Sequence, residues 1–158
     1  MADSPEYNQI ADQYIKNTSG RIDREEILIP SAEFYLGGIE GKEILDLACG
    51  DGYFARHFKK RLAKRVVGAD ISIEMIDRAK KQENLGSPEI LYHVVDVSRM
   101  KPLGKFDYVF AGFLLHYSKS ASELEAMAKA IFDQLKIDGK FVAFNENPYS
   151  PIQKGMVY

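Results

Sequence analysis

Residues 44–56 read ILDLACGDGYFAR, an apolar run that passes through two closely spaced glycines into a helical pattern. A strand, a glycine turn and a helix in this order leave unpaired N–H groups at the helix start, where a ligand can bind. Residues 50–55 also fit the G-x-G-x-x-G/A pattern of dinucleotide sites. That short pattern is weak evidence on its own, so the surrounding sequence must decide which ligand it serves.

Apolar runs of about five residues alternate with helical periodicity after this stretch. The runs cover residues 65–69, 90–95, 106–111 and 140–144, the last one after a turn at Asp138-Gly139. This alternation predicts an α/β, doubly wound domain with a mainly parallel sheet. The sheet is expected to be incomplete at its C-terminal edge, because only 13 residues follow Asn145. The apolar positions assigned to buried helix faces are Phe54, Phe58, Leu62, Ile73, Ile76, Ala79, Leu124, Met127, Ile131 and Leu135.

Two helices are predicted ahead of the sheet, over residues 5–17 and 22–36, with Gly37-Gly38 ending the second. We therefore expect one domain over residues 1–158, a length that suits a single core. Its parts are an N-terminal helical lid segment (1–38), an α/β core (44–147) and a tail (148–158).

Composition excludes several classes of protein. The net charge is −2 and 46% of the residues are hydrophobic, which argues against a protein that wraps nucleic acid or coats an anionic membrane. No apolar run approaches about 18 residues, and the N-terminus lacks the pattern of a secretory signal. The single cysteine excludes an internal disulfide and a cysteine metal cluster. We expect a cytoplasmic monomer or homodimer without a bound metal.

Acidic residues follow three successive predicted strands. Asp46, Asp70 and Asp96 come at or near the strand ends, and Asp51 lies within the glycine turn, where it is expected to cap the next helix. Parallel strands bring these carboxylates to one edge of the sheet, where they disfavour a pyrophosphate and suit a ligand with an ammonium or a sulfonium group. The pattern therefore favours a cationic nucleoside over NAD(P).

Four segments in this order resemble the motifs of class I S-adenosylmethionine-dependent methyltransferases. They are ILDLACGDG (44–52), VVGADIS (66–72), HVVDVS (93–98) and FDYVFAGFLLHYS (106–118), and the resemblance covers roughly residues 5–147. It implies a Rossmann-like fold, S-adenosylmethionine as cofactor and S-adenosylhomocysteine as product. One departure is that Ala48 stands where the family usually has the first glycine of the turn.

The resemblance also implies which residues hold the methionine and ribose parts of the cofactor. Asp46 would bind the methionine ammonium, directly or through water. The backbone of Ala48, Cys49 and Gly50 would pass against the methionine and the ribose, and Asp70 would accept hydrogen bonds from the ribose hydroxyls.

The adenine and the transferable methyl group have implied partners as well. Ile71 and Met75 would pack on the adenine, Asp96 would accept from its amino group, and the N–H of Val97 would serve a ring nitrogen. Phe113 would lie beside the methyl group.

The segments LLHYS (114–118), IADQY (10–14) and NENP (145–148) look similar to toxoflavin-synthase-like methyltransferases, which act on small heteroaromatic compounds. His116 is the candidate general base, with a loop hydrogen bond as the alternative. Tyr14 is a candidate lid residue over the cofactor, and Tyr7 and Tyr117 are candidate substrate contacts; packing on a helix face is the alternative for the lid tyrosines.

Two other functions stay open at this point. One is an NAD(P)-dependent oxidoreductase, and the other is a non-catalytic cofactor-binding scaffold. A nucleic-acid substrate is not expected. The basic run at 57–65 is interpreted as a solvated helix face, and the segment after residue 111 lacks the N/D-P-P-Y motif of enzymes that methylate adenine or glutamine amino groups.

Overall fold

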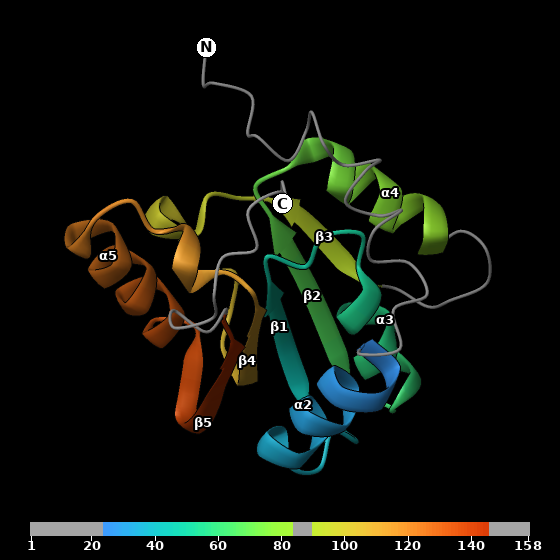
Figure 1. Cartoon of the computed structure of the whole chain (residues 1–158). Helices are drawn as coiled ribbons and strands as arrows, with labels where there is room; N and C mark the ends of the chain where they lie inside the picture. The colour runs from blue at the N-terminus through green and yellow to red at the C-terminus, as the bar shows by residue number, and fades with distance from the viewer. Residues whose placement is uncertain (1–23, 84–89, 146–158) are drawn as a thin grey trace.

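The computed structural model describes residues 24–83 and 90–145 of the chain (Figure 1). Within these ranges, five strands form one sheet in the order β3-β2-β1-β4-β5, and every pairing is parallel. The chain moves outward from β1 and then crosses back to β4, so β1 and β4 flank the point where the strand order reverses. Ligands of open α/β sheets bind at the carboxyl ends of the strands at such a point. The strands are β1 (Glu43–Leu47), β2 (Arg65–Asp70), β3 (Leu91–Val94), β4 (Phe106–Gly112) and β5 (Leu135–Phe144).

Helices cover both faces of the sheet, as the doubly wound prediction requires. On one face lie α2 (Ile29–Leu36), α3 (Tyr53–Lys60) and α4 (Ile73–Glu83), and on the other lies α5 (Ala121–Phe132) (Figure 1). Successive side chains of a strand point to opposite faces, so the buried residues form two clusters. One contains Ile44, Val66 and Phe58, and the other contains Leu45, Val67 and Met127. Short 3₁₀ turns follow two strands, η2 (Val97–Arg99) and η3 (Leu115–Tyr117).

The N-terminal helical segment is described from residue 24 onward. A π-helical turn, η1 (Arg24–Leu28), leads into α2, and Pro30 lies in the first turn of α2, where a missing N–H costs little. Gly37 ends α2 with a φ of 85°, so the predicted stop at Gly37-Gly38 is confirmed. The helix expected over residues 5–17, with Tyr7 and Tyr14, lies outside the described residues.

Four positions assigned to buried helix faces were wrong. Leu62 is 66% exposed and has a φ of 63°, because α3 already ends at Lys60 and the chain turns there toward β2. Ile73 and Leu124 lie in the first turns of α4 and α5, which start beyond the carboxyl edge of the sheet and leave these side chains exposed. Leu135 belongs to β5 rather than to α5.

The Asp138-Gly139 turn falls inside β5 and not before it. The pairing with β4 jumps from Phe106–Leu135 to Tyr108–Lys140, and Asp138 has a φ of 62°. A Cβ on Gly139 would lie 2.9 Å from the carbonyl oxygen of Lys136, so this turn requires glycine. The strand direction predicted for residues 140–144 is confirmed.

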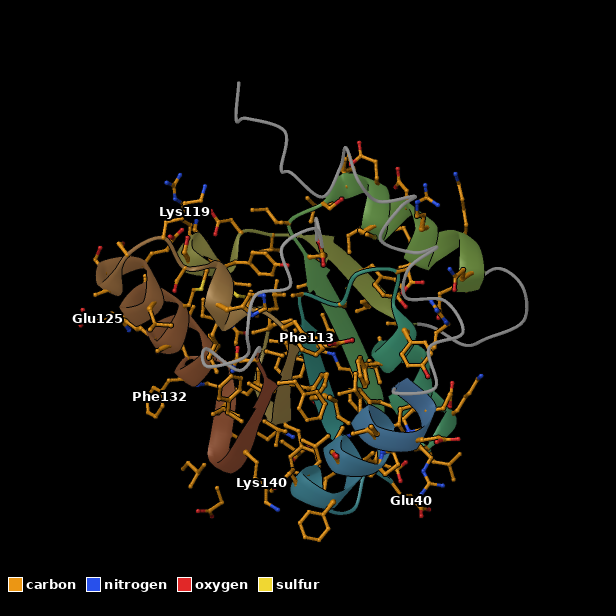
Figure 2. All side chains as sticks on the ribbon, viewed as in Figure 1. Glu40, Phe113, Lys119, Glu125, Phe132 and Lys140 are labelled. Atoms are coloured by element: carbon orange, nitrogen blue, oxygen red, sulfur yellow. The ribbon has the colours of Figure 1, made fainter. Side chains whose placement is uncertain are left out.

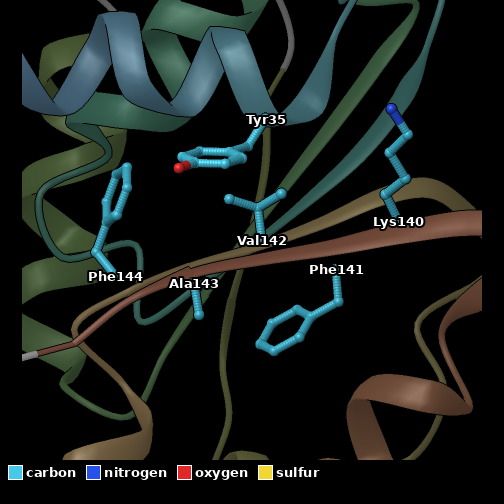
Figure 3. A pocket seen from close by; sticks show the side chains of 6 residues that line it. All are labelled: Tyr35, Lys140, Phe141, Val142, Ala143 and Phe144. Atoms are coloured by element: carbon cyan, nitrogen blue, oxygen red, sulfur yellow. The ribbon is translucent and has the colours of Figure 1, made fainter.

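β5 is the last strand of the described sheet, as expected from the sequence. An open groove of about 590 Å³ runs along it, between residues 140–144 and Tyr35 of α2. Val142 and Phe144 point toward Tyr35, whereas Phe141 points to the opposite side of the strand (Figure 3). None of the described helices is long and apolar enough to cross a bilayer.

Candidate functional site

The glycine loop, residues 48–52, connects β1 to α3 at the carboxyl edge of the sheet. Three of its residues have left-handed backbone conformations: Ala48 (φ 54°), Gly50 (φ 55°) and Gly52 (φ 81°). The N–H of Gly52 donates to the carbonyl of Cys49 at 2.9 Å and closes the turn. The left-handed conformation of Ala48 accounts for the glycine expected at that position by resemblance. A Cβ on Gly50 would meet nothing within 4 Å, so a ligand can approach the backbone there.

Asp70, at the end of β2, holds this loop in place. Its Oδ2 accepts the N–H of Gly50 at 2.8 Å, and its Oδ1 accepts the N–H of Ser72 at 2.9 Å. The residue is only 8% exposed, and burial raises the pKa of the carboxyl. Each carboxylate oxygen can accept a further hydrogen bond. Binding of a ribose by Asp70 therefore stays a prediction, to which the structure adds a second role as a tie between two loops.

Asp46 is the most deeply buried acid of the site. It is 1% exposed, lies in register with Gly68 of β2, and its Oδ2 has no hydrogen-bond partner among the described residues. Burial above all, and then the neighbouring Asp70, raises the pKa of this carboxyl well above its ordinary value; a hydrogen bond with the backbone of Ala55 opposes the shift. A buried carboxyl without a partner is unfavourable unless a cation or donor completes it. Asp46 is therefore suited to an ammonium ligand.

Asp51 does not cap α3, contrary to expectation. Gly52 is the N-cap residue, and its left-handed conformation leaves the helix start without a side-chain cap. The Asp51 carboxylate instead accepts a hydrogen bond from Gln82 Nε2 of α4 at 3.4 Å, and its carbonyl accepts one from Arg56 Nη1 at 2.5 Å. The loop is thus tied to α4 and to the first turn of α3.

Cys49 lies inside the loop and is 7% exposed. Burial first, and then three neighbouring aspartates, raises the pKa of its thiol well above the ordinary value. A thiol that stays protonated is a poor nucleophile. These observations support the interpretation of Cys49 as a small residue beside a ligand.

Asp96 caps η2. Its Oδ1 accepts the N–H and the Oγ–H of Ser98 at 2.9 and 2.7 Å, and its Oδ2 lies 3.8 Å from Arg99 Nε. The side chain is 38% exposed, so it can also reach a ligand. Val97, the first residue of η2, is buried. Contacts of Asp96 and Val97 with an adenine stay predictions.

Ile71 and Met75 follow β2 and differ in what they can offer an adenine ring. Ile71 is 46% exposed and presents apolar surface at the carboxyl edge. Met75 is 2% exposed, inside the first turn of α4, and so has little surface left for a ligand. The structure favours Ile71 for an apolar contact, and both roles stay predictions.

The segment after β4 carries an aromatic group. Phe113 has a φ of 65° and donates its N–H to the carbonyl of Phe144, at the end of β5, at 2.8 Å. The ring of His116 lies 6.3 Å from that of Phe113 and 4.2 Å from that of Tyr117. His116 and Tyr117 are both exposed, and Figure 2 labels Phe113 between the β5 side of the sheet and α3. The three predicted residues Phe113, His116 and Tyr117 thus lie together.

Sequence reasoning missed two residues near the site. Phe144 lies 6.4 Å from Phe113, ring centre to ring centre, and its place at the end of a predicted strand could have drawn attention to it. Tyr92 of β3 is buried beneath the glycine loop. No motif in the sequence points to Tyr92.

The basic run at 57–65 is mostly engaged in local ion pairs. His57 and Arg61 contact Glu33 at 2.9 and 2.8 Å, and Lys64 and Arg65 lie 3.4 and 3.7 Å from Glu43. This supports its interpretation as an ordinary polar helix face.

The site is built on a segment that matches a known family. Residues 44–139, more than half of the chain, match the family described as methyltransferase domain. The chain belongs to this methyltransferase family. The match begins in β1 and contains the glycine loop, Asp70, Asp96 and the aromatic group after β4.

Similar proteins include solved structures and a named enzyme. An S-adenosylmethionine-dependent methyltransferase from Mesorhizobium loti is 29% identical with a TM-score of 0.65, over 75% of this chain and 53% of that one. DhpI, solved as a complex with SAM and HEP, is 25% identical with a TM-score of 0.73, over 91% of this chain and 64% of that one. A malonyl-[acyl-carrier protein] O-methyltransferase from Legionella pneumophila is 34% identical over 84 residues, 52% of this chain and 29% of the relative. The chain thus spans less than two thirds of the length of each.

The residues of the methyltransferase site fit S-adenosylmethionine, the cofactor of the family. The buried, unpartnered Oδ2 of Asp46 suits an ammonium group, and the open side of Gly50 leaves room for ligand atoms against the backbone. The mutual repulsion of Asp46, Asp51 and Asp70 disfavours a pyrophosphate at this loop. Both the family and the charges favour S-adenosylmethionine over NAD(P).

Proposed function

We propose that the protein transfers a methyl group from S-adenosylmethionine to a small molecule that carries an aromatic or heteroaromatic ring. The observation that carries this proposal is the buried carboxyl of Asp46, which lacks a partner within the described residues, behind a glycine loop whose Gly50 is open to a ligand. A cationic nucleoside supplies the missing partner and fills the open side.

The reaction asks the protein mainly for geometry. Bound S-adenosylmethionine supplies an activated methyl group, so the chain has to hold the acceptor in line with the methyl–sulfur bond and exclude water. Asp46 binds the ammonium end, the glycine loop positions the methionine and the ribose, and Asp70 holds the loop while accepting from the ribose. Ile71 and Asp96 bind the adenine.

The aromatic group at the end of β4 supports a flat acceptor. Phe113, His116 and Tyr117 offer rings that stack on such a molecule, and two of the three are exposed. His116 removes a proton when the acceptor's nucleophile carries one. With a nucleophile that carries no proton, the residue only positions the acceptor.

Larger acceptors and a non-catalytic role are the alternatives. The Legionella relative is named for an acyl-carrier protein, so a carrier-bound acceptor belongs in the same test. A scaffold would bind the cofactor without turnover.

The first test is calorimetric titration of the chain with S-adenosylhomocysteine, with NAD and NADP as controls. We expect micromolar binding of S-adenosylhomocysteine alone, and Asp70→Ala is expected to weaken it at least tenfold, about 1.4 kcal/mol. Binding of NAD or NADP instead would overturn the proposed cofactor.

Turnover is tested with radiolabelled S-adenosylmethionine against small heteroaromatic compounds and an acyl-carrier protein. Label transferred to a small ring compound supports the proposal. Label transferred only to the carrier protein replaces the acceptor, and cofactor binding without transfer to any of them favours the scaffold. His116→Gln separates the roles of that residue, because a base is lost with little change in acceptor KM.

A further inference from the structure

Tyr92 lies in the middle of β3, with its side chain on the face of the sheet that carries α3 and α4. Its neighbour on β2 is Gly68, and Gly68 is in turn in register with Asp46 of β1. A Cβ placed on Gly68 would lie 2.6 and 2.7 Å from the Cδ1 and Cε1 atoms of the Tyr92 ring. The ring therefore lies flat across Gly68, in space that any other residue there would fill.

The far end of the same ring reaches the glycine loop. A Cβ placed on Gly52 would clash with the Tyr92 hydroxyl and would lie 3.0 Å from Cζ. Gly52 is the residue from which α3 starts, and its N–H closes the turn onto Cys49. One phenol thus spans the distance from the second strand to the end of the loop and lies directly beneath Gly52.

The hydroxyl of Tyr92 gains nothing visible from its own polar chemistry. It is buried and has no hydrogen-bond partner among the described residues, and the residue as a whole is 8% exposed. A buried hydroxyl without a partner destabilises the folded chain relative to the same ring without it. Its observed contact is steric, against the underside of Gly52.

Other side chains hold the loop from different directions. Arg56 Nη1 bonds the carbonyl of Asp51, Gln82 bonds the Asp51 carboxylate, and Asp70 bonds the N–H of Gly50. These hydrogen bonds restrain the loop laterally. Tyr92 fills the space on the core side of Gly52.

We infer that Tyr92 is a positioning residue whose phenol supports Gly52 from the core side and so fixes the height at which the glycine loop presents its backbone to the S-adenosyl ligand. This inference rests on the proposed cofactor site. The hydroxyl costs stability and contributes the last part of the support, so its removal should separate stability from affinity.

The test compares Tyr92→Phe with Tyr108→Phe. Tyr108 is a matched control: it is also 8% exposed and packs in the same cluster, but its hydroxyl donates to the carbonyl of Gly38 at 3.1 Å, near the end of α2. For Tyr92→Phe we expect an unchanged or higher melting temperature and a three- to tenfold weaker Kd for S-adenosylhomocysteine. For Tyr108→Phe we expect a lower melting temperature and an unchanged Kd.

A second readout needs no ligand. Amide hydrogen exchange of residues 49–53 in the ligand-free chain should be faster in Tyr92→Phe than in the wild type and unchanged in Tyr108→Phe. Wild-type affinity together with wild-type exchange in Tyr92→Phe would overturn the inference. If the wild type and Tyr108→Phe bind no S-adenosylhomocysteine while exchange still changes in Tyr92→Phe, the cofactor assignment fails and the support of the loop stands.

Discussion

Asp46 is a carboxyl group placed where ionisation is costly. Its folded-state pKa lies well above 3.8, chiefly because of burial. An acid whose folded pKa is raised contributes its full stability below the unfolded pKa, and that contribution is lost as the pH rises through the folded pKa. The ligand-free chain therefore accepts a stability cost at neutral pH at the residue that is suited to bind a cation.

Asp46→Asn should remove this cost. We expect the variant to gain stability relative to the wild type as the pH rises from about 4 to 7, by about 1 kcal/mol or 2–4 °C in melting temperature. Urea unfolding at several pH values measures the difference. The same variant should bind S-adenosylhomocysteine at least tenfold more weakly, about 1.4 kcal/mol; a pH-independent difference in stability would contradict the assignment.

The acids show how far residues could be predicted from the sequence. Strand periodicity placed Asp46, Asp70 and Asp96 at one edge of the sheet, and the structure has them there. What each oxygen binds depends on loop geometry that no local pattern specifies. Asp70 turns back to the N–H of Gly50, Asp96 caps η2, and Asp51 leaves the capping of α3 to a left-handed Gly52.

At the scale of elements, α5 shows a helix start fixed by side chains. Ser120 Oγ accepts the N–H of Glu123 at 3.1 Å, and the Glu123 carboxylate accepts the N–H of Lys119 at 2.6 Å. This reciprocal arrangement closely follows the capping box. It satisfies two donors that the helix leaves unpaired.

Ser120→Ala should lower the free energy of unfolding by about 1 kcal/mol, because the N–H of Glu123 loses its acceptor. Ser120→Asp, which keeps an acceptor at the cap, should retain most of the stability. Denaturant titration measures both. The affinity for S-adenosylhomocysteine should stay unchanged in both variants, and a parallel loss of affinity would show that α5 is coupled to the site.

The elements were easier to predict than their ends. Each of the first four strands begins and ends within one residue of its predicted limits, because short apolar runs in a parallel sheet leave little choice of register. β5 begins five residues earlier than predicted, since the Asp138-Gly139 turn is accommodated as an irregularity within the pairing. Periodicity also extended α3 to Leu62, beyond the point where a positive φ ends the helix.

The whole molecule separates its two sheet edges by task. The carboxyl edge carries the unpaired acid and the left-handed loop residues, whereas the amino edge carries a charge network in which Lys136 lies 3.0 Å from Asp107 and 3.8 Å from Glu43. Asp107 also accepts the N–H of Glu43 at 2.8 Å, and this bond chiefly lowers the pKa of its carboxyl. The amino edge is thus internally satisfied while the carboxyl edge awaits a ligand.

A ligand that completes the carboxyl edge should stabilise the whole domain. At about one hundred times its Kd, S-adenosylhomocysteine should raise the free energy of unfolding by about 2.7 kcal/mol. Thermal unfolding with and without ligand measures this gain, and NAD at the same concentration is the control. An equal gain with NAD would mean that the loop does not discriminate by charge.

The burial of Cys49 has a practical consequence. Because the sequence has a single cysteine, and that thiol is enclosed by the loop beneath which Tyr92 lies, a thiol-reactive dye should label the native chain slowly. The labelling rate then reports how often the loop opens, without any engineered probe. A cysteine introduced at exposed Ile137, at the opposite end of the sheet, would react far sooner and would let one molecule carry both a fast reference label and a slow internal clock.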